Sequence, residues 1–235
     1  MKDKIFILSI FLMLSILGLG LISDNPLFTA NWALISVLFL GLVITAFFRS
    51  FERHSPSAKE IALIATMAAL AAAVRVPFAI LPGIQPTTFL VMITGWVFGV
   101  QSGFVVGALA ALASNFFLGQ GPWTPWQMFC WGMGGVAAAL LARRNTEFNL
   151  QKFTILACSW GYIFGWLMNI WHWVGFIYPL NMKTFLATYV ASFPFDTLHA
   201  MGNVVISLTF GKTFHHVIQR FKRKITVITL KENEN

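Results

Sequence analysis

Long apolar runs are the feature that most constrains how this chain can fold. A bilayer core of ~30 Å is crossed by about 20 apolar helical residues, and stretches near that length follow one another along the sequence. Hydrophobic residues make up 57% of the chain and charged residues only 10%, which excludes an ordinary water-soluble domain because so much apolar surface could not be buried. The aromatic content of 15% also excludes intrinsic disorder. We therefore predict an all-α integral membrane protein.

The apolar stretches divide into eight predicted spans. They cover residues 4–23, 31–49, 58–79, 86–101, 103–119, 126–142, 153–177 and 185–211. The run 86–119 would be about 51 Å long as one helix at ~1.5 Å per residue, which is too long for one crossing. We therefore place a break at Val100–Gly103. The first stretch lacks a small-x-small cleavage site and precedes a second span directly, so it is interpreted as an uncleaved anchor rather than a signal peptide.

The distribution of basic residues predicts the orientation. With a cytoplasmic N-terminus, all of the 16 Lys and Arg residues fall on the cytoplasmic side except Lys183, which is outside, and Arg75, which is within a span. This bias follows the positive-inside rule, so both termini are predicted to be cytoplasmic. The net charge of +8 then requires no nucleic-acid partner. Basic residues at 220–224 suit anionic lipid headgroups or a cytoplasmic partner.

Composition also predicts the domain organisation. The first two spans are plain Leu/Ile/Phe helices, whereas the later spans carry Ala, Gly, Trp, Asn and Gln. We predict a two-helix membrane extension (1–50), a basic cytoplasmic linker (51–57), a six-helix core (58–211) and a basic cytoplasmic tail (212–235). No inverted repeat is apparent by eye, which argues against many secondary-transporter folds.

Small residues recur at helical spacing in the core. Alanines form a stripe on one face of the third span, at Ala58, Ala62, Ala65, Ala69 and Ala72. Such a stripe suits either packing within the chain or docking of another subunit, because small side chains let helix backbones approach closely in lipid. Glycines recur in the next two spans, at Gly95, Gly99, Gly103 and Gly107. We interpret the glycines as a tight hairpin and close-packing positions.

Polar and aromatic residues gather at the predicted outer ends of the spans. Residues 114–128 combine Pro, Gly and Trp with Asn, Gln and Thr, which suits a rigid ligand mouth or a membrane anchor. Residues 169–173, Asn-Ile-Trp-His-Trp, add an amide and a histidine. The candidate substrate-binding residues are Arg75, Gln85, Asn115, Gln120, Trp123, Thr124, Trp126, Gln127, Trp131, Asn169, His172 and Tyr178.

Asp196 is an acidic residue within a predicted span, three residues before His199. Ionisable groups in a membrane are costly, so they mark a function or a buried partner. Either His199 or Arg75 could pair with Asp196, and we expect Asp196 and His199 to serve folding or coupling rather than affinity. The sequence contains no P-loop, paired carboxylates or nucleophile pattern, and the cysteines lack metal-ligand spacing. No catalytic residue, cofactor or metal site is predicted.

Several segments between residues 57 and 212 form a recognisable pattern. They are the alanine stripe, Val74–Phe78, Gln85–Thr88, Gly95–Gly103 and Gly119–Met128. This pattern resembles the substrate-binding S components of energy-coupling factor (ECF) transporters, and most of all the cobalamin-type S component. The two N-terminal spans depart from the minimal six-helix pattern of that family.

The resemblance implies a six-helix vitamin binder in a bacterial cell membrane, with no ATPase activity of its own. It implies a transmembrane T component that docks on the alanine motifs, and two ATP-binding-cassette ATPases on the cytoplasmic side. The vitamin, cobalamin or a related corrinoid, would enter from outside between residues 80–86, 119–126 and 178–184, and would be released inward when the partners hydrolyse ATP.

Two alternatives stay open. The chain could be an S component for another, smaller heteroaromatic vitamin or its precursor, because Trp and amide side chains suit either ligand. It could instead be an integral membrane enzyme that acts on a lipid through Asp196, His199 and His172. The alanine stripe and the Trp-rich loop favour the transport subunit.

Overall fold

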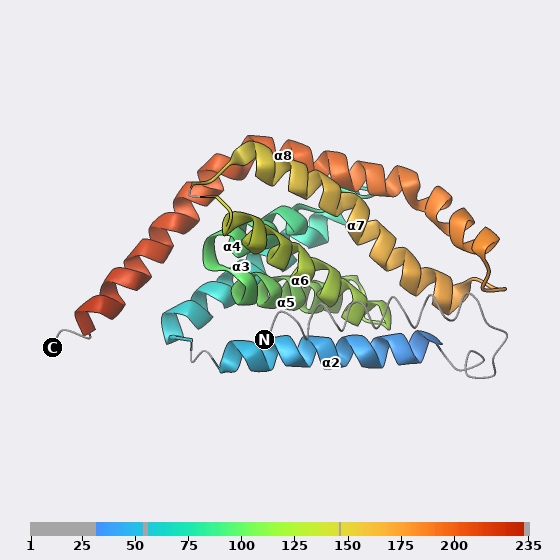
Figure 1. Ribbon diagram of the computed structural model, residues 1–235, viewed down its shortest axis with the longest axis horizontal. Helices are drawn as coiled ribbons and strands as arrows, with labels where there is room; N and C mark the ends of the chain where they lie inside the picture. The colour runs from blue at the N-terminus through green and yellow to red at the C-terminus, as the bar shows by residue number, and fades with distance from the viewer. Residues whose placement is uncertain (1–31, 54–55, 146, 233–235) are drawn as a thin grey trace.

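The computed structural model describes residues 32–53, 56–145 and 147–232, so the predicted span 4–23 lies outside the described residues. This part of the chain is all-helical, without a strand. Its helices are α2 (Trp32–Glu52), α3 (Ala58–Phe78), α4 (Pro86–Phe98), α5 (Val100–Leu118), α6 (Trp123–Ala142), α7 (Leu150–Phe176) and α8 (Met182–Glu232). In the view of Figure 1, α3–α6 lie between α2 on one side and the α7–α8 pair on the other.

The protein is a multi-pass membrane protein, as predicted. Four of the described helices, α2, α3, α5 and α7, are long and apolar enough to cross a bilayer. Helix α4 has only 13 residues and is buried along nearly its whole length, so it packs inside the bundle. Helix α6 begins with Trp, Thr, Pro and Gln, and polar residues recur along α8, which lowers the hydropathy of both.

The helix boundaries follow from local sequence signals. The Oγ of Ser57 accepts a hydrogen bond from the backbone N–H of Glu60, which caps the start of α3. The side chain of Asn149 caps α7 in the same way through Lys152. The predicted break at Val100–Gly103 is wrong by one residue. The chain turns at Gly99, whose φ of 95° is open to glycine and strained for other residues.

Glycines bring α4, α5 and α6 into backbone contact. A Cβ added to Gly95 would lie 2.0 Å from the carbonyl oxygen of Gly135, and one added to Gly135 would lie 2.4 Å from that of Gly103. A Cβ on Gly107 would meet the backbone nitrogen of Gly132 at 2.5 Å. The interpretation of Gly95, Gly103 and Gly107 as close-packing positions is therefore confirmed, and α6 supplies the matching glycines.

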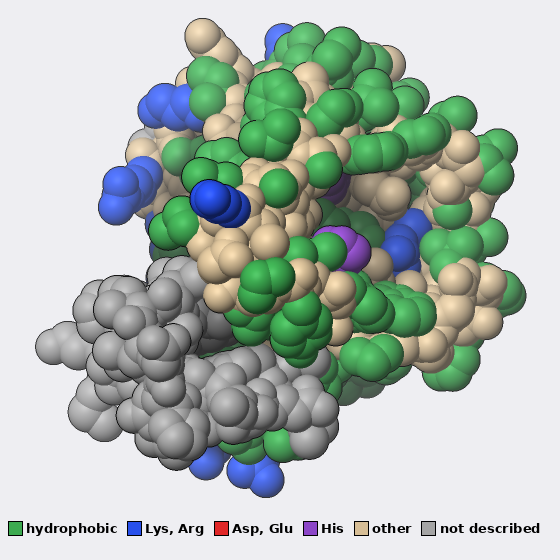
Figure 2. All heavy atoms as spheres, turned by 90° about the vertical axis from the view of Figure 1, so that its right-hand side faces the viewer, with side chains coloured by type: hydrophobic (Ala, Val, Ile, Leu, Met, Phe, Trp, Pro, Cys, Tyr) green, Lys and Arg blue, Asp and Glu red, His purple; other side chains and the backbone are tan. Residues whose placement is uncertain are grey.

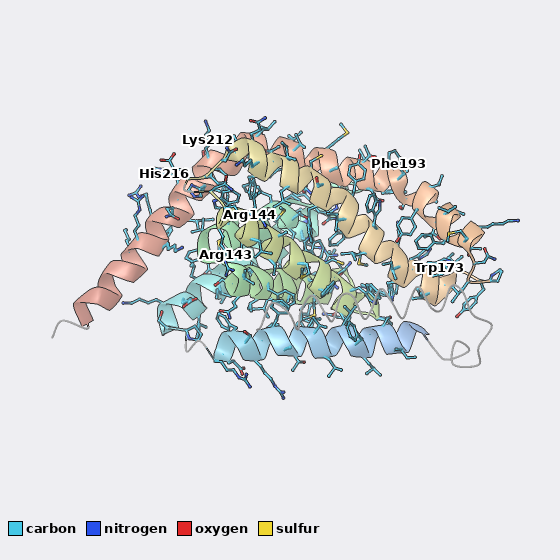
Figure 3. The ribbon with its side chains drawn as sticks, in the orientation of Figure 1. Arg143, Arg144, Trp173, Phe193, Lys212 and His216 are labelled. Atoms are coloured by element: carbon cyan, nitrogen blue, oxygen red, sulfur yellow. The ribbon has the colours of Figure 1, made fainter. Side chains whose placement is uncertain are left out.

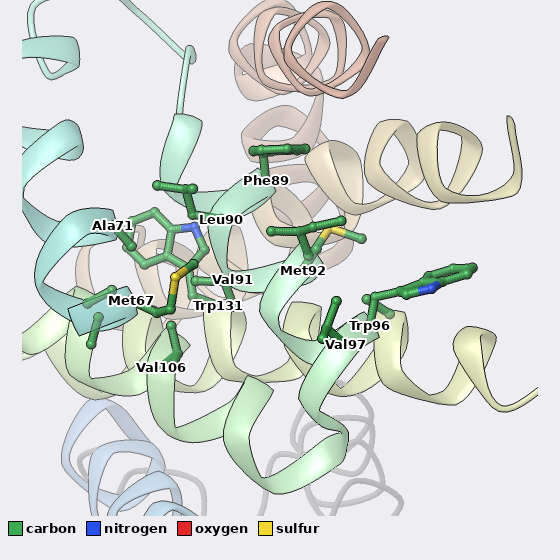
Figure 4. Close-up of a cluster of buried hydrophobic side chains, with 14 of the residues drawn as sticks. Met67, Ala71, Phe89, Leu90, Val91, Met92, Trp96, Val97, Val106 and Trp131 are labelled. Carbon is green, nitrogen blue, oxygen red and sulfur yellow. The ribbon is translucent and has the colours of Figure 1, made fainter. Parts of the chain in front are cut away.

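The core is built from aromatic and aliphatic side chains around this glycine crossing. Figure 4 shows Trp131 beside Met67 and Ala71 of α3 and Leu90 of α4. Helix α2 adds a second cluster on the outside of α5 and α6, where the ring of Phe47 stacks on Phe104 at 3.7 Å between centroids. Helix α2, which holds the described part of the predicted extension, therefore packs directly against α5 and α6.

Two predicted boundaries change in the folded chain. The predicted outer loop 119–126 is shorter, because α6 begins at Trp123, directly after Pro122. The other connections at this end lie at residues 79–85 and 177–181. The predicted division between core and tail at residues 211–212 lies inside α8, which continues as one helix to Glu232.

Candidate binding site at the predicted outer end

Arg75 lies at the centre of a polar cluster in the last turn of α3. Its side chain is only 7% exposed, and Nη1 donates hydrogen bonds to Ser114 Oγ and Asn115 Oδ1, both at 2.6 Å. The guanidinium carbon also lies 4.6 Å from the centroid of the Trp131 ring. Neutral dipoles and an aromatic face thus stabilise this buried cation in place of a carboxylate.

Asn115 connects Arg75 to the α5–α6 turn. Its Nδ2 donates to Thr124 Oγ1 at 3.0 Å and to Gln127 Oε1 at 2.8 Å. Thr124 Oγ1 in turn donates to Gln120 Oε1 at 2.9 Å. We call Arg75, Ser114, Asn115, Thr124 and Gln127 the outer cluster. Its side-chain hydrogen bonds join α3, α5 and α6, and they hold the α5–α6 turn in place against the end of α3.

A second polar contact lies behind the Trp131 ring. The indole Nε1 of Trp131 donates to Thr88 Oγ1 at 3.0 Å, and Thr88 Oγ1 lies 2.8 Å from His199 Nε2. His199 is buried, with the ring of Phe164 5.2 Å away. This contact joins α6, α4 and α8 and holds the indole plane against Arg75.

Within the part of the chain that the structure describes, three buried polar atoms at the ends of these helices have no hydrogen-bond partner. They are Arg75 Nε, Gln85 Oε1 and Trp126 Nε1. Two are donors and one is an acceptor, and they come from the ends of α3, α4 and α6. Buried polar groups are normally paired, so these atoms are suited to an organic ligand that both donates and accepts hydrogen bonds.

Helix α8 presents a stripe of buried and half-buried polar residues to the bundle. Its members follow one another at intervals of three or four residues: Thr184, Thr188, Ser192, Asp196, His199, Asn203 and Ser207. Asn169 Nδ2 donates to Ser192 Oγ at 2.6 Å, and Ser192 Oγ lies 2.9 Å from Asp196 Oδ2, to which it donates. Asn169 therefore faces α8 rather than the outer cluster.

The two pairings predicted for Asp196 are wrong. Ser192 is its hydrogen-bond partner, whereas His199 contacts Thr88 and Arg75 contacts α5. The reason is tertiary: Arg75 lies on the side of α3 that faces α5 and α6, and Asp196 faces Gly165 of α7. Among the described residues, no group of three His, Cys, Asp or Glu side chains could hold a metal ion.

Other predicted site residues lie at the surface. His172 is exposed and stacks on Phe176 at 5.7 Å between ring centroids, and Tyr178 is 73% exposed. Gln120 is exposed at the α5–α6 turn, and Trp123 lies half-buried, edge-on to Trp171. The outer cluster therefore brings together only part of the predicted set, with Trp131 against Arg75. Trp126 is buried in the second hydrophobic cluster, which includes residues of α2.

The alanine stripe is divided by the fold. Ala58, Ala62, Ala65 and Ala69 are exposed along α3, which leaves a surface of small residues open. Ala72 is buried against the bundle, so the exposed face does not include it.

Figure 2 views the end of the molecule where α7 ends and α8 begins. The surface is hollowed there, and histidine and basic side chains lie in and around the hollow. No acidic side chain is visible on this face. The α5–α6 turn lies at the same end in Figure 1, so the outer cluster belongs to this end.

Ser114, Thr88 and Ser192 are polar partners that the sequence analysis missed. A Ser or Thr in an apolar helix is by itself a weak signal of a site, because its hydroxyl can bond to a carbonyl of its own helix. The regular spacing of Ser192 with Asp196 and His199 was a usable signal, since it places all three on one face of α8.

The fold and the site together define a class: an all-helical integral membrane protein with a buried basic, amide and aromatic cluster at one end, suited to binding an organic ligand. A sequence model of the family described as "ECF-type riboflavin transporter, S component" matches residues 55–216, and the chain belongs to this family. No curated protein and no solved structure matches the chain.

Family membership confirms the predicted class of protein, an ECF S component, but not the predicted cobalamin type. The chain is an S component, a substrate-binding subunit of a transporter, and the family implies a T component, ATPases and a vitamin-like ligand as partners. The family is named for riboflavin, so the cobalamin-type resemblance receives no support. The match includes α3–α7 and most of α8, but not α2 or the last part of α8.

Proposed function

We propose that this chain is the S component that binds riboflavin, or a close flavin relative, at the outer cluster and delivers it inward through partner subunits that hydrolyse ATP. The observation that carries the proposal is Arg75, a buried cation held by Ser114 and Asn115 and stacked on Trp131. A flavin offers a flat ring for the indoles and an imide edge that donates and accepts hydrogen bonds. Arg75 Nε, which has no hydrogen-bond partner among the described residues, would supply a donor for that edge.

A flavin suits this site better than a corrinoid because the helices around it approach closely. Trp126 and Trp131 are fully buried, and glycines bring α4, α5 and α6 into backbone contact behind them. A corrinoid would need a wider mouth than the short connection between α5 and α6 offers. The family name supports the same choice.

The deciding experiment is a titration of the purified protein with riboflavin, followed by quenching of flavin fluorescence, and with cobalamin and cobinamide in parallel. We expect riboflavin to bind and Gln127→Ala to weaken binding about 5- to 150-fold, since a lost buried hydrogen bond costs ~1–3 kcal/mol. His172→Ala is the matched control, because His172 is exposed. Corrinoid binding without riboflavin binding, or equal losses in both variants, would reject the proposal.

We further propose that the exposed alanines of α3 dock the T component. Ala69→Trp should abolish co-purification with the T component while riboflavin affinity stays unchanged, because a large side chain holds the helices apart. Leu70→Trp is the control, since Leu70 is 40% exposed but lies off the stripe. Normal assembly of Ala69→Trp, or equal loss in Leu70→Trp, would contradict the docking role.

The orientation remains the predicted one, with both termini cytoplasmic. Labelling of Phe117→Cys by a membrane-impermeant reagent tests it, after Cys130 and Cys158 are replaced. Phe117 is 78% exposed beside the α5–α6 turn, so it should react in intact cells. Arg143→Cys, at the other end of α6, should react only after permeabilisation. The reverse pattern would invert the topology.

A further inference from the structure

Helix α8 extends well beyond what a membrane crossing needs. It has 51 residues, about 76 Å at ~1.5 Å per residue, whereas a bilayer core takes about 20 residues. The family match ends at residue 216, so the last part of α8 is outside the region that the family shares. Figure 1 shows this part leaving the bundle at the end opposite to the α5–α6 turn.

The start of this last part of α8 is fixed to the bundle. Ile218 is 4% exposed and belongs to the main hydrophobic core. Lys222 Nζ donates to the backbone oxygen of Val97 at 2.5 Å, near the C-terminal end of α4. A cation is favourable there because the last carbonyls of a helix carry partial negative charge. These two contacts determine which face of the last part of α8 stays exposed.

The face of α8 that the described residues leave exposed combines apolar and basic side chains. Val217, Arg220, Phe221 and Lys224 line a hollow on α8, and we call these four residues the basic hollow. Val217 is 46% and Phe221 52% exposed, and the basic side chains flank them at helical spacing. The sequence contains no Asp or Glu between residues 197 and 231, so no nearby acid of α8 neutralises these charges.

We infer that the basic hollow binds the phosphate headgroup of an anionic lipid, with Val217 and Phe221 against the upper acyl chain. Basic residues that flank an apolar helix face favour anionic lipid surfaces. Figure 3 places Lys212 and His216 of α8 at the same end as Arg143 and Arg144, the predicted cytoplasmic end. A partner shared by the family would dock on shared features, whereas the basic hollow lies beyond the region that the family model matches. The inference is independent of which vitamin binds.

Native mass spectrometry of the full chain tests the inference. The protein is purified from mixed micelles with equal phosphatidylglycerol and phosphatidylcholine, and the ratio of retained lipids is measured. We expect the wild type to retain phosphatidylglycerol in preference, and R220E/K224E to lower that ratio by about tenfold, which corresponds to ~1.4 kcal/mol. Excess inorganic phosphate should not displace the lipid, because it lacks the acyl chain that Val217 and Phe221 contact.

The matched control is R143E/R144E, which makes the same charge change on exposed residues at the same end. It should keep the ratio within about twofold of the wild type. A second variant, V217S/F221S, keeps the charges and should also lower phosphatidylglycerol retention. It tests the inference even if R220E/K224E fails to fold. An unchanged ratio in the folded variants of the hollow, equal loss in the control, or displacement by phosphate would overturn the inference. So would loss of T-component co-purification in R220E/K224E with lipid retention unchanged.

Discussion

The outer cluster and the polar stripe of α8 use similar residues in different ways. In the outer cluster the hydrogen bonds run between helices, from Arg75 on α3 to Asn115 on α5 and from there to Gln127 on α6. The stripe also contacts α4 and α7, through His199, Ser192 and Asn203. Several of its other bonds stay within α8: Thr188 Oγ1 donates to the carbonyl of Thr184 at 2.9 Å. Bonds between helices fix the helices relative to one another, whereas a hydroxyl bonded to its own helix does not.

We propose that this difference separates ligand binding from conformational coupling. The outer cluster is a preorganised platform, which suits a ligand because little has to be ordered on binding. The stripe leaves Asn203 Oδ1 and Ser207 Oγ without partners in a fully buried position, although Asn203 Nδ2 donates to the carbonyl of Ala157. Arg75 Nε in the outer cluster is unpartnered as well, so we base the proposed contrast on the hydrogen bonds that link three helices in the outer cluster. We therefore expect the outer cluster to set affinity and the stripe to set stability and coupling.

The largest effect should come from Arg75. Arg75→Met should weaken riboflavin binding by about 100-fold or more, because it removes charge-assisted hydrogen bonds worth ~1.5–3 kcal/mol and the stacked cation over Trp131. Arg75→Lys should restore only part of the affinity, since an ammonium lacks the planar fork of a guanidinium. Fluorescence titration of purified protein measures both, with the exposed Arg143→Met as control. Near-wild-type affinity of Arg75→Met would remove the outer cluster from the binding site.

The second comparison sets one amide of the outer cluster against the acid of the stripe. Gln127→Leu should weaken riboflavin binding about tenfold, because Asn115 loses an acceptor and the ligand loses a polar neighbour. Asp196→Asn should leave affinity within about threefold and reduce transport in reconstituted vesicles instead, because Asp196 bonds to Ser192, and through it to Asn169, rather than to the outer cluster. Unchanged affinity in Gln127→Leu with a large loss in Asp196→Asn would place the ligand at the stripe.

The sequence predicted much of the fold because apolar runs of membrane length have few other solutions. The helix ends that were missed have local causes. Any of the glycines between Gly95 and Gly107 could have turned the chain, and only the positive φ of Gly99 distinguishes the one that does. Spacing showed that Asp196 and His199 share a face of α8, but not which helix lies opposite. The partners of both residues therefore had to come from the structure.

The candidate site was predicted by residue type more than by position. Arg75, Asn115 and Gln127 converge as expected, because the ends of α3, α5 and α6 meet. His172 does not, since Trp173 takes the buried position at the end of α7 and donates its indole N–H to Thr184. Neighbouring residues on a helix point about 100° apart, so a shift of one residue decides between site and surface.

The smallest effect, and the most direct contrast, comes from one substitution made in both regions. Ser114 and Ser207 are both fully buried serines, but Ser114 Oγ accepts from Arg75 and donates to the carbonyl of Ala110, whereas Ser207 Oγ has no partner. Ser114→Ala should lower stability by ~1–3 kcal/mol because it leaves Arg75 one acceptor short. Ser207→Ala removes an unpaired hydroxyl, so its stability should be equal to or slightly above that of the wild type.

Thermal unfolding in detergent measures both variants under one condition. A protein of this size shifts its Tm by roughly 2–4 °C per kcal/mol, so Ser114→Ala should melt several degrees below the wild type and Ser207→Ala within about 1 °C of it or higher. Adding riboflavin should increase the difference in Tm between the two variants. Ser207→Ala should bind the ligand normally and be stabilised by it, whereas Ser114→Ala, altered in the outer cluster, should be stabilised less. If Ser207→Ala fell as far as Ser114→Ala, the hydroxyl of Ser207 would have a partner in the membrane. The stripe would then be as firmly bonded as the outer cluster, and the contrast between a fixed and a rearranging region would fail.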